Sequence, residues 1–369
     1  MVDIRVRRLA DLIAGYCIEV TKGMEVIVSA TTAAIPLVVE LYRAILQRGG
    51  YPHAMITDEV LGETFYRFAD EETLKYVPRL DKFIFENIDA LVRILSSTHT
   101  KYLSSIDPAR ISTAQAARRE LKEIFLRRAA EGKLKWVIAP YPTKALAQEA
   151  SMSYTEYEDF VFRATMVDRE DPITAWKEQA KFQERVAQFL SKISELHIVA
   201  EDTDLKLRVE GRKWINDDGK HNMPGGEVFT GPIEDSIEGY IVFTYPAIWG
   251  GREVEGIKLV FKKGNVVEAK AIKGEDFLKK MLETDEGAKK VGEFAFGLNY
   301  SINVFTKEIL FDEKIGGTIH LAVGSSYPET GGRNISAIHW DMIKDMKKGK
   351  IYADGDLVYE KGKFIEGIL

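Results

Sequence analysis

Two short segments near the C-terminal end of the chain alternate apolar and polar residues, a pattern typical of β-strands with one buried face. In the first segment, Thr318, His320 and Ala322 alternate with large aliphatic residues. In the second, His339 and Asp341 alternate with isoleucine, tryptophan and methionine. Because successive strand side chains point to opposite sides, residues two apart share a face. The two segments therefore predict strands that bury one face and present imidazole and carboxylate groups on the other.

Other polar residues with metal-binding chemistry accompany these segments. Glu313 precedes the first one, and the Gly- and Ser-rich loop between the two carries Tyr327. Further upstream, Glu227 and Glu293 each follow a glycine and lead into an apolar run that resembles a strand. The chain thus offers three carboxylates and two imidazoles in Glu227, Glu293, His320, His339 and Asp341. Such groups are natural ligands of zinc, cobalt or manganese, so the set predicts a site for two divalent ions.

Each of these residues also has an ordinary structural interpretation. A His-x-Asp pair on a strand is often simply exposed, and either Glu227 or Glu293 could be satisfied by a structural salt bridge. Glu313 could pair with the neighbouring Lys314 or orient His320 instead of contacting a substrate. The two-metal hypothesis rests on the set as a whole.

Length and composition exclude several classes of protein. A chain of 369 residues predicts two domains, and a net charge of -6 argues against a nucleic-acid-binding surface. Cys17 is the only cysteine, which excludes a disulfide framework and fits a reducing compartment. The N-terminus lacks the apolar core of a secretory signal, and no apolar run approaches the roughly 20 residues of a membrane span. We therefore expect a cytoplasmic protein. Its Lys, Arg and Glu content is typical of heat-adapted proteins.

The texture of the sequence changes near residue 195. Residues 1–195 alternate strand-like and helix-like segments, which predicts a doubly wound α/β domain with a parallel sheet. Residues 196–369 contain short alternating segments separated by Gly, Asn and Asp, including a predicted hairpin turn at Lys263-Gly264-Asn265. They predict an α+β, mostly antiparallel β domain that carries the metal site. The loop at Ser29–Thr32 lacks the glycines of nucleotide-binding motifs, so helix capping is its expected role.

Four blocks of this sequence resemble the aminopeptidase T and aminopeptidase S family of metallo-aminopeptidases: NMPGGEVFT, GEFAFG, DEKIGGTIH and SAIHWDM. The resemblance implies an N-terminal α/β domain, a metal-bearing C-terminal domain and a homodimer with an enclosed catalytic cavity. It also implies a metal site made of Glu227, Glu293, His320, Tyr327, His339 and Asp341. Glu293 would bridge the two ions. The connection between Tyr327 and His339 is short for this family, so the resemblance does not extend to the substrate preference of those loops.

The expected reaction is hydrolysis of the N-terminal residue from a peptide with a free amino end, by a water activated between two divalent ions. Tyr327 would ligate a metal or donate its phenol to a developing oxyanion, and the general base is either Glu293 or Glu313. Two alternatives stay open. A two-metal hydrolase of a phosphoester or N-acyl amide would need a basic clamp, for which Arg333 and Lys314 are the nearby cations. A protein that binds metal or ligand without turnover would not hydrolyse aminoacyl amides.

Overall fold

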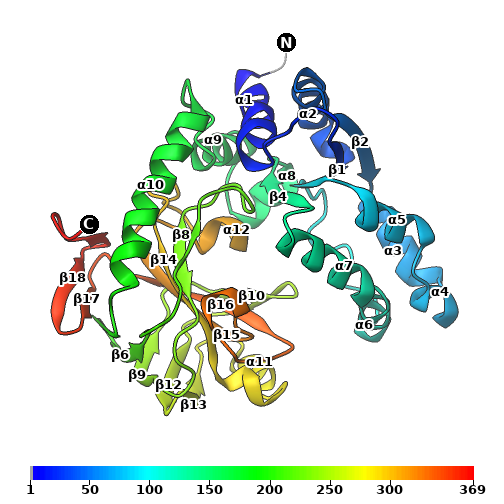
Figure 1. The fold of residues 1–369 in the computed structure, drawn as a ribbon. Helices are drawn as coiled ribbons and strands as arrows, with labels where there is room; N and C mark the ends of the chain where they lie inside the picture. Colours follow the sequence, from blue (N-terminus) through cyan, green and yellow to red (C-terminus); the bar gives the residue numbers. More distant parts are fainter. Residues whose placement is uncertain (1–2) are drawn as a thin grey trace. The chain divides into compact units, whose positions relative to one another are not determined.

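The computed structural model describes residues 3–369, which form two compact units. The first contains the chain up to Ala175 together with Lys220–Met223, and the second contains Trp176–Gly219 and Pro224–Leu369 (Figure 1). Within residues 3–369, no helix combines the length and the apolar character that crossing a bilayer requires.

A four-stranded parallel sheet organises the first unit, in the order β2-β1-β3-β4. Its strands are β1 (Glu25–Thr31), β2 (Tyr51–Thr57), β3 (Ala90–Leu95) and β4 (Lys135–Pro140). Parallel neighbours need crossover connections, and helices supply them. α2 (Ile35–Gln47) connects β1 to β2; α3 (Glu59–Phe68), α4 (Glu71–Lys75) and α5 (Arg79–Asn87) connect β2 to β3; α6 (Pro108–Ala117) and α7 (Arg119–Ala130) connect β3 to β4. α1 (Ile4–Leu12) precedes the sheet, and α8 (Lys144–Glu149) and α9 (Tyr154–Ala164) follow it, while α10 (Pro172–Leu190) begins in the first unit and lies mostly in the second. This confirms the predicted α/β fold of the N-terminal part. The hydroxyl of Thr31 accepts a hydrogen bond from the Ala33 amide, so it caps as expected.

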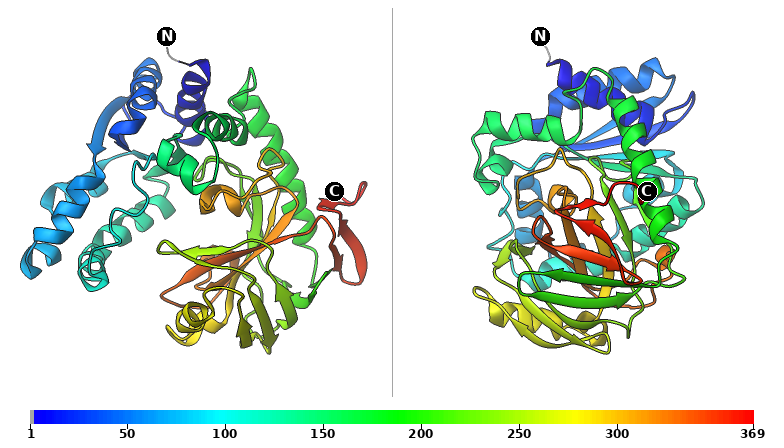
Figure 2. Two further views of the ribbon diagram at one scale, coloured as in Figure 1. Left: turned by 180° about the vertical axis from the view of Figure 1, so that it is seen from behind. Right: turned by 90° about the vertical axis from the view of Figure 1, so that its left-hand side faces the viewer.

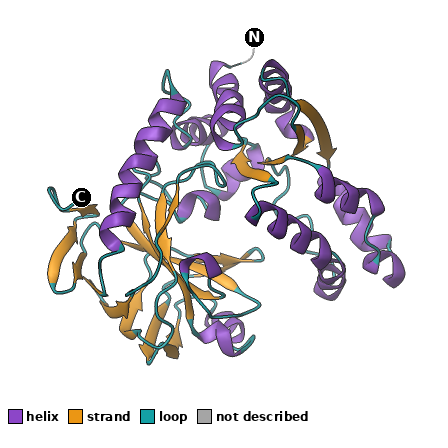
Figure 3. Ribbon diagram, viewed as in Figure 1, coloured by secondary structure: helices purple, strands orange, loops and turns teal. Residues whose placement is uncertain are grey.

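Antiparallel strands make up most of the second unit (Figures 2 and 3). An eight-stranded sheet has the order β13-β12-β9-β6-β5-β17-β18-β19, and a five-stranded sheet has the order β16-β15-β14-β8-β7. The strands are β5 (Glu195–Ala200), β6 (Thr203–Arg208), β7 (Ile215–Asp217), β8 (Glu227–Thr230), β9 (Glu238–Val242), β10 (Ala247–Trp249), β11 (Arg252–Val254), β12 (Lys258–Lys262), β13 (Asn265–Lys270), β14 (Val291–Gly297), β15 (Thr318–Gly324), β16 (His339–Asp345), β17 (Lys350–Ala353), β18 (Asp356–Glu360) and β19 (Lys363–Phe364). Two short helices, α11 (Glu275–Leu282) and α12 (Ile309–Asp312), interrupt them. The predicted antiparallel fold of this part is confirmed.

The predicted hairpin turn joins β12 to β13. Lys263 and Gly264 both have positive φ angles, 48° and 74°, as a two-residue turn with the right-handed strand twist requires.

Opposite faces of the five-stranded sheet have different chemistry. One face belongs to the main hydrophobic core and carries Phe294, Phe296, Leu321, Trp340 and Met342, all at most 2 % exposed. This is the apolar side of the alternation predicted around His320 and His339. Because the core fixes which residues of each strand point inward, it also fixes which point to the other face.

Candidate metal centre

Five of the predicted donors lie on the second face of the five-stranded sheet. Glu227 begins β8, Glu293 lies on β14, His320 on β15, and His339 and Asp341 on β16. Residues directly opposite one another in antiparallel strands share a face. The register places Glu293 opposite Ala322, and Ala322 opposite Asp341, in one row across three strands.

Small residues separate the donors on this face. The partners of Glu227, His320 and Glu293 across the strands are Gly297, Ala295 and Ala322. Larger side chains at these positions would fill the space between the carboxylates and imidazoles. The sheet therefore keeps a polar hollow open.

Glycines bring other backbone segments close to the two upstream glutamates. Gly226 has a φ of 124°, and a Cβ atom there would overlap the side chain of Asn299. A Cβ on Gly292 would overlap the carbonyl oxygens of Gly324 and Ser325. The two Gly-Glu steps thus reflect close packing around the site.

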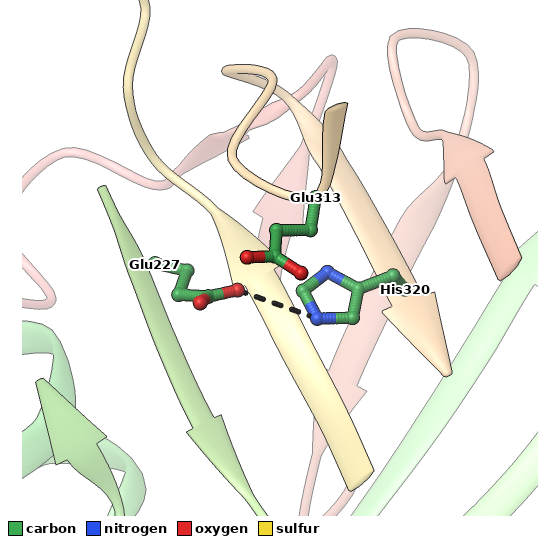
Figure 4. Close-up of side chains that lie close together, drawn as sticks. All are labelled: Glu227, Glu313 and His320. Carbon is green, nitrogen blue, oxygen red and sulfur yellow. Dashed lines mark ion pairs between the residues drawn. The ribbon is translucent and has the colours of Figure 1, made fainter. Parts of the chain in front are cut away.

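The donors form two clusters, each compact enough to hold one metal ion. The first consists of Glu227, Glu313 and His320, whose candidate ligand atoms lie within 4.8 Å of one another. Figure 4 shows these three side chains pointing toward one another, with His320 Nε2 3.3 Å from Glu227 Oε2. Glu313, which directly follows α12, extends its side chain into the cluster.

The second cluster consists of Glu293, His339 and Asp341, again with candidate ligand atoms within 4.8 Å. His339 Nε2 lies 3.2 Å from Glu293 Oε2 and 3.6 Å from Asp341 Oδ1. The other ring nitrogen, Nδ1, lies 2.8 Å from the carbonyl oxygen of Ser325. A carbonyl only accepts, so Nδ1 carries the hydrogen and Nε2 faces the carboxylates, as in many metal-binding histidines.

Glu293 connects the two clusters. Its Oε1 atom lies 3.2 Å from His320 Nε2, while its Oε2 atom faces His339. Burial alone would raise the pKa of Glu293, but the hydrogen bonds with the two imidazoles lower it to about 2. This carboxyl group is therefore ionised at any physiological pH and is shared between both clusters.

Lys314 and Asp217 belong to the same buried network, although sequence reasoning gave neither a place in the metal site. The Lys314 side chain is fully buried, and its Nζ atom pairs with Glu313 and lies 3.4 Å from Glu227 and 3.5 Å from Asp217. The proposed Glu313–Lys314 ion pair is present, and Glu313 also belongs to the cluster of His320. A lysine directly after a glutamate and within an apolar stretch was the available signal for this buried cation.

Burial and mutual contact shift the pKa values of the other donors. Burial raises the pKa of Glu227 well above its usual range, although Lys314 opposes the shift. Burial also raises the pKa of Asp341 to about 6 and that of Asp217 to about 7. The carboxylates oppose burial at the histidines, where they raise the pKa of His320 to about 9 and that of His339 to about 10.

Tyr327, which precedes a short 3-10 helix at Pro328–Thr330, lies beside the second cluster. Its ring centroid is 5.0 Å from that of His339 and 5.4 Å from that of Phe229. Burial, with Glu293 and Asp341 nearby, raises the pKa of its phenol above the ordinary value. The phenol therefore stays protonated at neutral pH and is available as a donor.

These residues fit a pair of divalent ions. Glu227 Oε2 and His320 Nδ1 are buried without a hydrogen-bond partner, and such atoms are rare unless something else satisfies them. Carboxylate oxygens and imidazole nitrogens are the usual protein ligands of zinc, and they also suit manganese and cobalt. The low pKa of Glu293 supplies an ionised carboxylate that both clusters contact.

Comparison with known proteins decides the family. A family model described as thermophilic metalloprotease (M29) matches residues 2–364. The chain belongs to this family. It is 29% identical to aminopeptidase AmpS of Bacillus subtilis, with 94% of each chain covered, and 29% identical to aminopeptidase T of Thermus thermophilus, with 94% and 95% covered. Among solved structures, wild-type AmpT from Thermus thermophilus superposes with a TM-score of 0.86 at 26% identity, covering 98% of this chain and 99% of that one.

Because the M29 family is a family of metalloproteases, the raised pKa values of the two histidines bear on metal binding. Metal ligation requires neutral imidazole, so a divalent ion that binds to His320 and His339 at pH 7 would have to displace the protons that these histidines hold in the metal-free protein. We expect apparent affinity for zinc to rise with pH until about 9–10, because less work is then spent on deprotonation. Isothermal titration calorimetry in two buffers of different ionisation enthalpy should report net proton release. An identical binding enthalpy in both buffers would contradict the predicted proton release.

Lys314 is expected to stabilise the metal-free protein through its charge. Lys314→Met leaves Asp217, Glu227 and Glu313 without their cation, and removing one partner of a buried ion pair typically costs about 3–5 kcal/mol. Without this cation the folded-state pKa of Asp217 and Glu227 would rise further, so the deficit should grow as the pH rises above about 7 and shrink as the pH falls below it.

Denaturant unfolding of metal-free protein across that pH range measures this effect. Lys344→Met is the matched control, because Lys344 is also buried but its Nζ donates to the carbonyl oxygens of Glu201 and Val242. Burial lowers the pKa of Lys344 from its ordinary alkaline value, so any pH dependence of this variant's deficit belongs to the alkaline range and not to the region near pH 7 where Asp217 titrates. Equal pH profiles for the two variants would refute a charge-balancing role for Lys314.

Proposed function

We propose that this M29 family member is a metal-dependent aminopeptidase that removes the N-terminal residue from peptides, with residues 196–369 as its catalytic domain. The observation that carries the proposal is the pair of adjoining clusters that share Glu293. The names of its relatives, aminopeptidase AmpS and aminopeptidase T, support the same activity. The proposed ions are zinc, cobalt or manganese.

The proposed ligands are Glu227 and His320 on one side, His339 and Asp341 on the other, and Glu293 between them, with Tyr327 next to the second cluster. Two such ions, when bound, lower the pKa of a shared water and polarise the scissile carbonyl. Glu293 suits the shared position, because each of its oxygens already faces a different cluster.

We assign the general base to Glu313. Its side chain is 17 % exposed, whereas that of Glu227 is 6 % exposed and that of His320 is fully buried. A base must reach water and pass its proton on to the leaving amine, so the more accessible carboxylate is the better candidate. Lys314 holds this carboxylate in place.

Tyr327 is proposed to act as a donor rather than as a base. Its phenol stays protonated because burial and the carboxylates raise its pKa. A neutral O–H beside the second cluster can stabilise the oxyanion that develops on the carbonyl oxygen. Lys314 lies buried among three carboxylates and offers no free charge to a phosphate, which disfavours a phosphoester as substrate.

The acidic surroundings also suit a substrate with a free amino end. A positively charged α-amino group is attracted by carboxylates, whereas an acetylated end carries no charge. Cleavage should therefore proceed one residue at a time from the amino end.

The proposal predicts that hydrolysis of aminoacyl amides needs both metal and a free amino group. Metal-reconstituted protein should hydrolyse unblocked substrates, and chelation or N-acetylation should abolish turnover. His339→Ala should lower metal content and activity together, since it removes a donor from the second cluster. Met342→Ala is the matched control on the opposite face, where loss of the buried side chain should cost about 2–5 kcal/mol of stability. Full turnover in protein shown to be metal-free by elemental analysis would disprove the function.

We further propose that the enzyme acts as a homodimer in the cytoplasm. Five large apolar side chains on α3 and α5 are at least 63% exposed: Val60, Leu61, Phe68, Leu80 and Phe83. Clustered exposed apolar groups often mark association surfaces. Light scattering should give a mass twice the 41.7 kDa of one chain. The double variant Leu61→Lys/Leu80→Lys should give the mass of a single chain. A monomeric wild-type protein at micromolar concentration would exclude the dimer.

A further inference from the structure

A cavity of about 210 Å³ adjoins the second metal cluster, within the second unit. Its lining includes His339 and Asp341 at the cluster, and Trp249, Phe305 and Ile309 farther along. The cavity borders β16, which is the last strand of the five-stranded sheet, and the amides of Thr244 and Tyr245 donate to the carbonyl oxygen of Ile343 on its outer edge. The strand that supplies two candidate ligands thus also supplies a wall of this cavity.

Aromatic contacts hold the apolar walls in place. The ring centroid of Trp249 is 6.2 Å from that of Trp340, and Phe305 stacks on Tyr245 at 5.2 Å. Trp249 and Phe305 are only partly buried, and Ile309 is 44% exposed. Fixed, partly exposed apolar groups next to a polar reaction centre are what a site for an apolar side chain requires.

The charged residues of the lining are engaged in structural contacts. Lys307 Nζ lies 3.2 Å from a carboxylate oxygen of Glu253. Asp312 accepts hydrogen bonds from the amide and hydroxyl of Thr306, at 2.7 and 2.9 Å. Glu308 accepts from the Leu310 amide at the start of α12. The lining therefore presents mainly apolar surface, and the carboxylate of Asp341 at its inner end disfavours an acidic group.

The size of the cavity fits one side chain. Its volume corresponds to roughly seven waters at about 30 Å³ each, and it is smaller than the roughly 300–1,000 Å³ of pockets that enclose drug-sized ligands. A substrate bound at His339 and Asp341 could extend a single side chain into the cavity.

We propose that this cavity receives the side chain of the N-terminal residue of the substrate and selects large apolar side chains, such as Leu, Met and Phe, over small and acidic ones. This specificity rests on the aminopeptidase function proposed above. Ile309 lines the cavity, and it is distinct from the proposed ligands and base.

The test compares kcat/KM for the amides of leucine, phenylalanine, alanine and glutamate. Wild-type enzyme should prefer leucine and phenylalanine. Ile309→Trp fills the cavity and should lower the leucine-to-alanine ratio by roughly 10–200-fold, the range that poor fit in an apolar pocket typically produces. Ile309→Ala enlarges the cavity and should shift the preference from leucine toward phenylalanine.

Val304→Trp is the matched control. Val304 is 37% exposed in the segment before α12 but does not line the cavity, so this variant should keep the wild-type ratio. Melting temperature and metal content, measured for every variant, identify a variant that has lost its fold, in which case the Ile309→Ala comparison decides.

The outcomes separate the two proposals. If the wild-type enzyme hydrolyses none of the amides, the aminopeptidase function itself fails. If it hydrolyses them but prefers glutamate or alanine, or if both Ile309 variants keep the wild-type ratios, the cavity is not the specificity site and only this inference is overturned.

Discussion

The metal centre depends on one electrostatic constraint, which is that every buried charge must have a partner. Lys314 is fully enclosed, and it is tolerated because Asp217, Glu227 and Glu313 surround its ammonium group. Asp217 and Glu227 need that cation in turn, since desolvation raises the pKa of both carboxyl groups and Lys314 opposes the rise. A fixed positive charge thus lets acidic side chains gather in the interior, where without it they would take up protons.

The sheet supplies the geometry that this balance requires. Aromatic and aliphatic residues anchor one face of β14, β15 and β16 in the core, so the alternate residues are forced together on the other face. Alanine and glycine at the intervening positions leave room for the donors to approach one another. The close packing of this hydrophobic core holds the strands rigidly, and it thereby fixes the positions of the polar side chains on their other face.

Alternation made part of the site predictable. The faces of His320, His339 and Asp341 followed from the spacing of apolar neighbours, and the Gly-Glu steps pointed to Glu227 and Glu293. The same local pattern predicted a mostly antiparallel β domain, because the alternation of a strand is visible in consecutive residues.

Other parts depend on contacts between distant segments, which local pattern does not encode. Asp217 meets Lys314 only because β7 and the segment after α12 converge in the fold. The cavity beside β16 arises where β10 and the segment before α12 approach the same strand edge. Sequence also could not distinguish Glu293 from Glu313, since only the structure shows which carboxylate faces both histidines.

The two carboxylate oxygens of Glu293 face different clusters, so rotation about a single side-chain bond moves a candidate ligand atom of both clusters at once. A rotation of its carboxylate that favours His320 also moves the oxygen that faces His339. The position that suits an ion in one half would therefore alter the ligand oxygen offered to the other half, and the reciprocity of linked equilibria makes such a coupling equal in both directions.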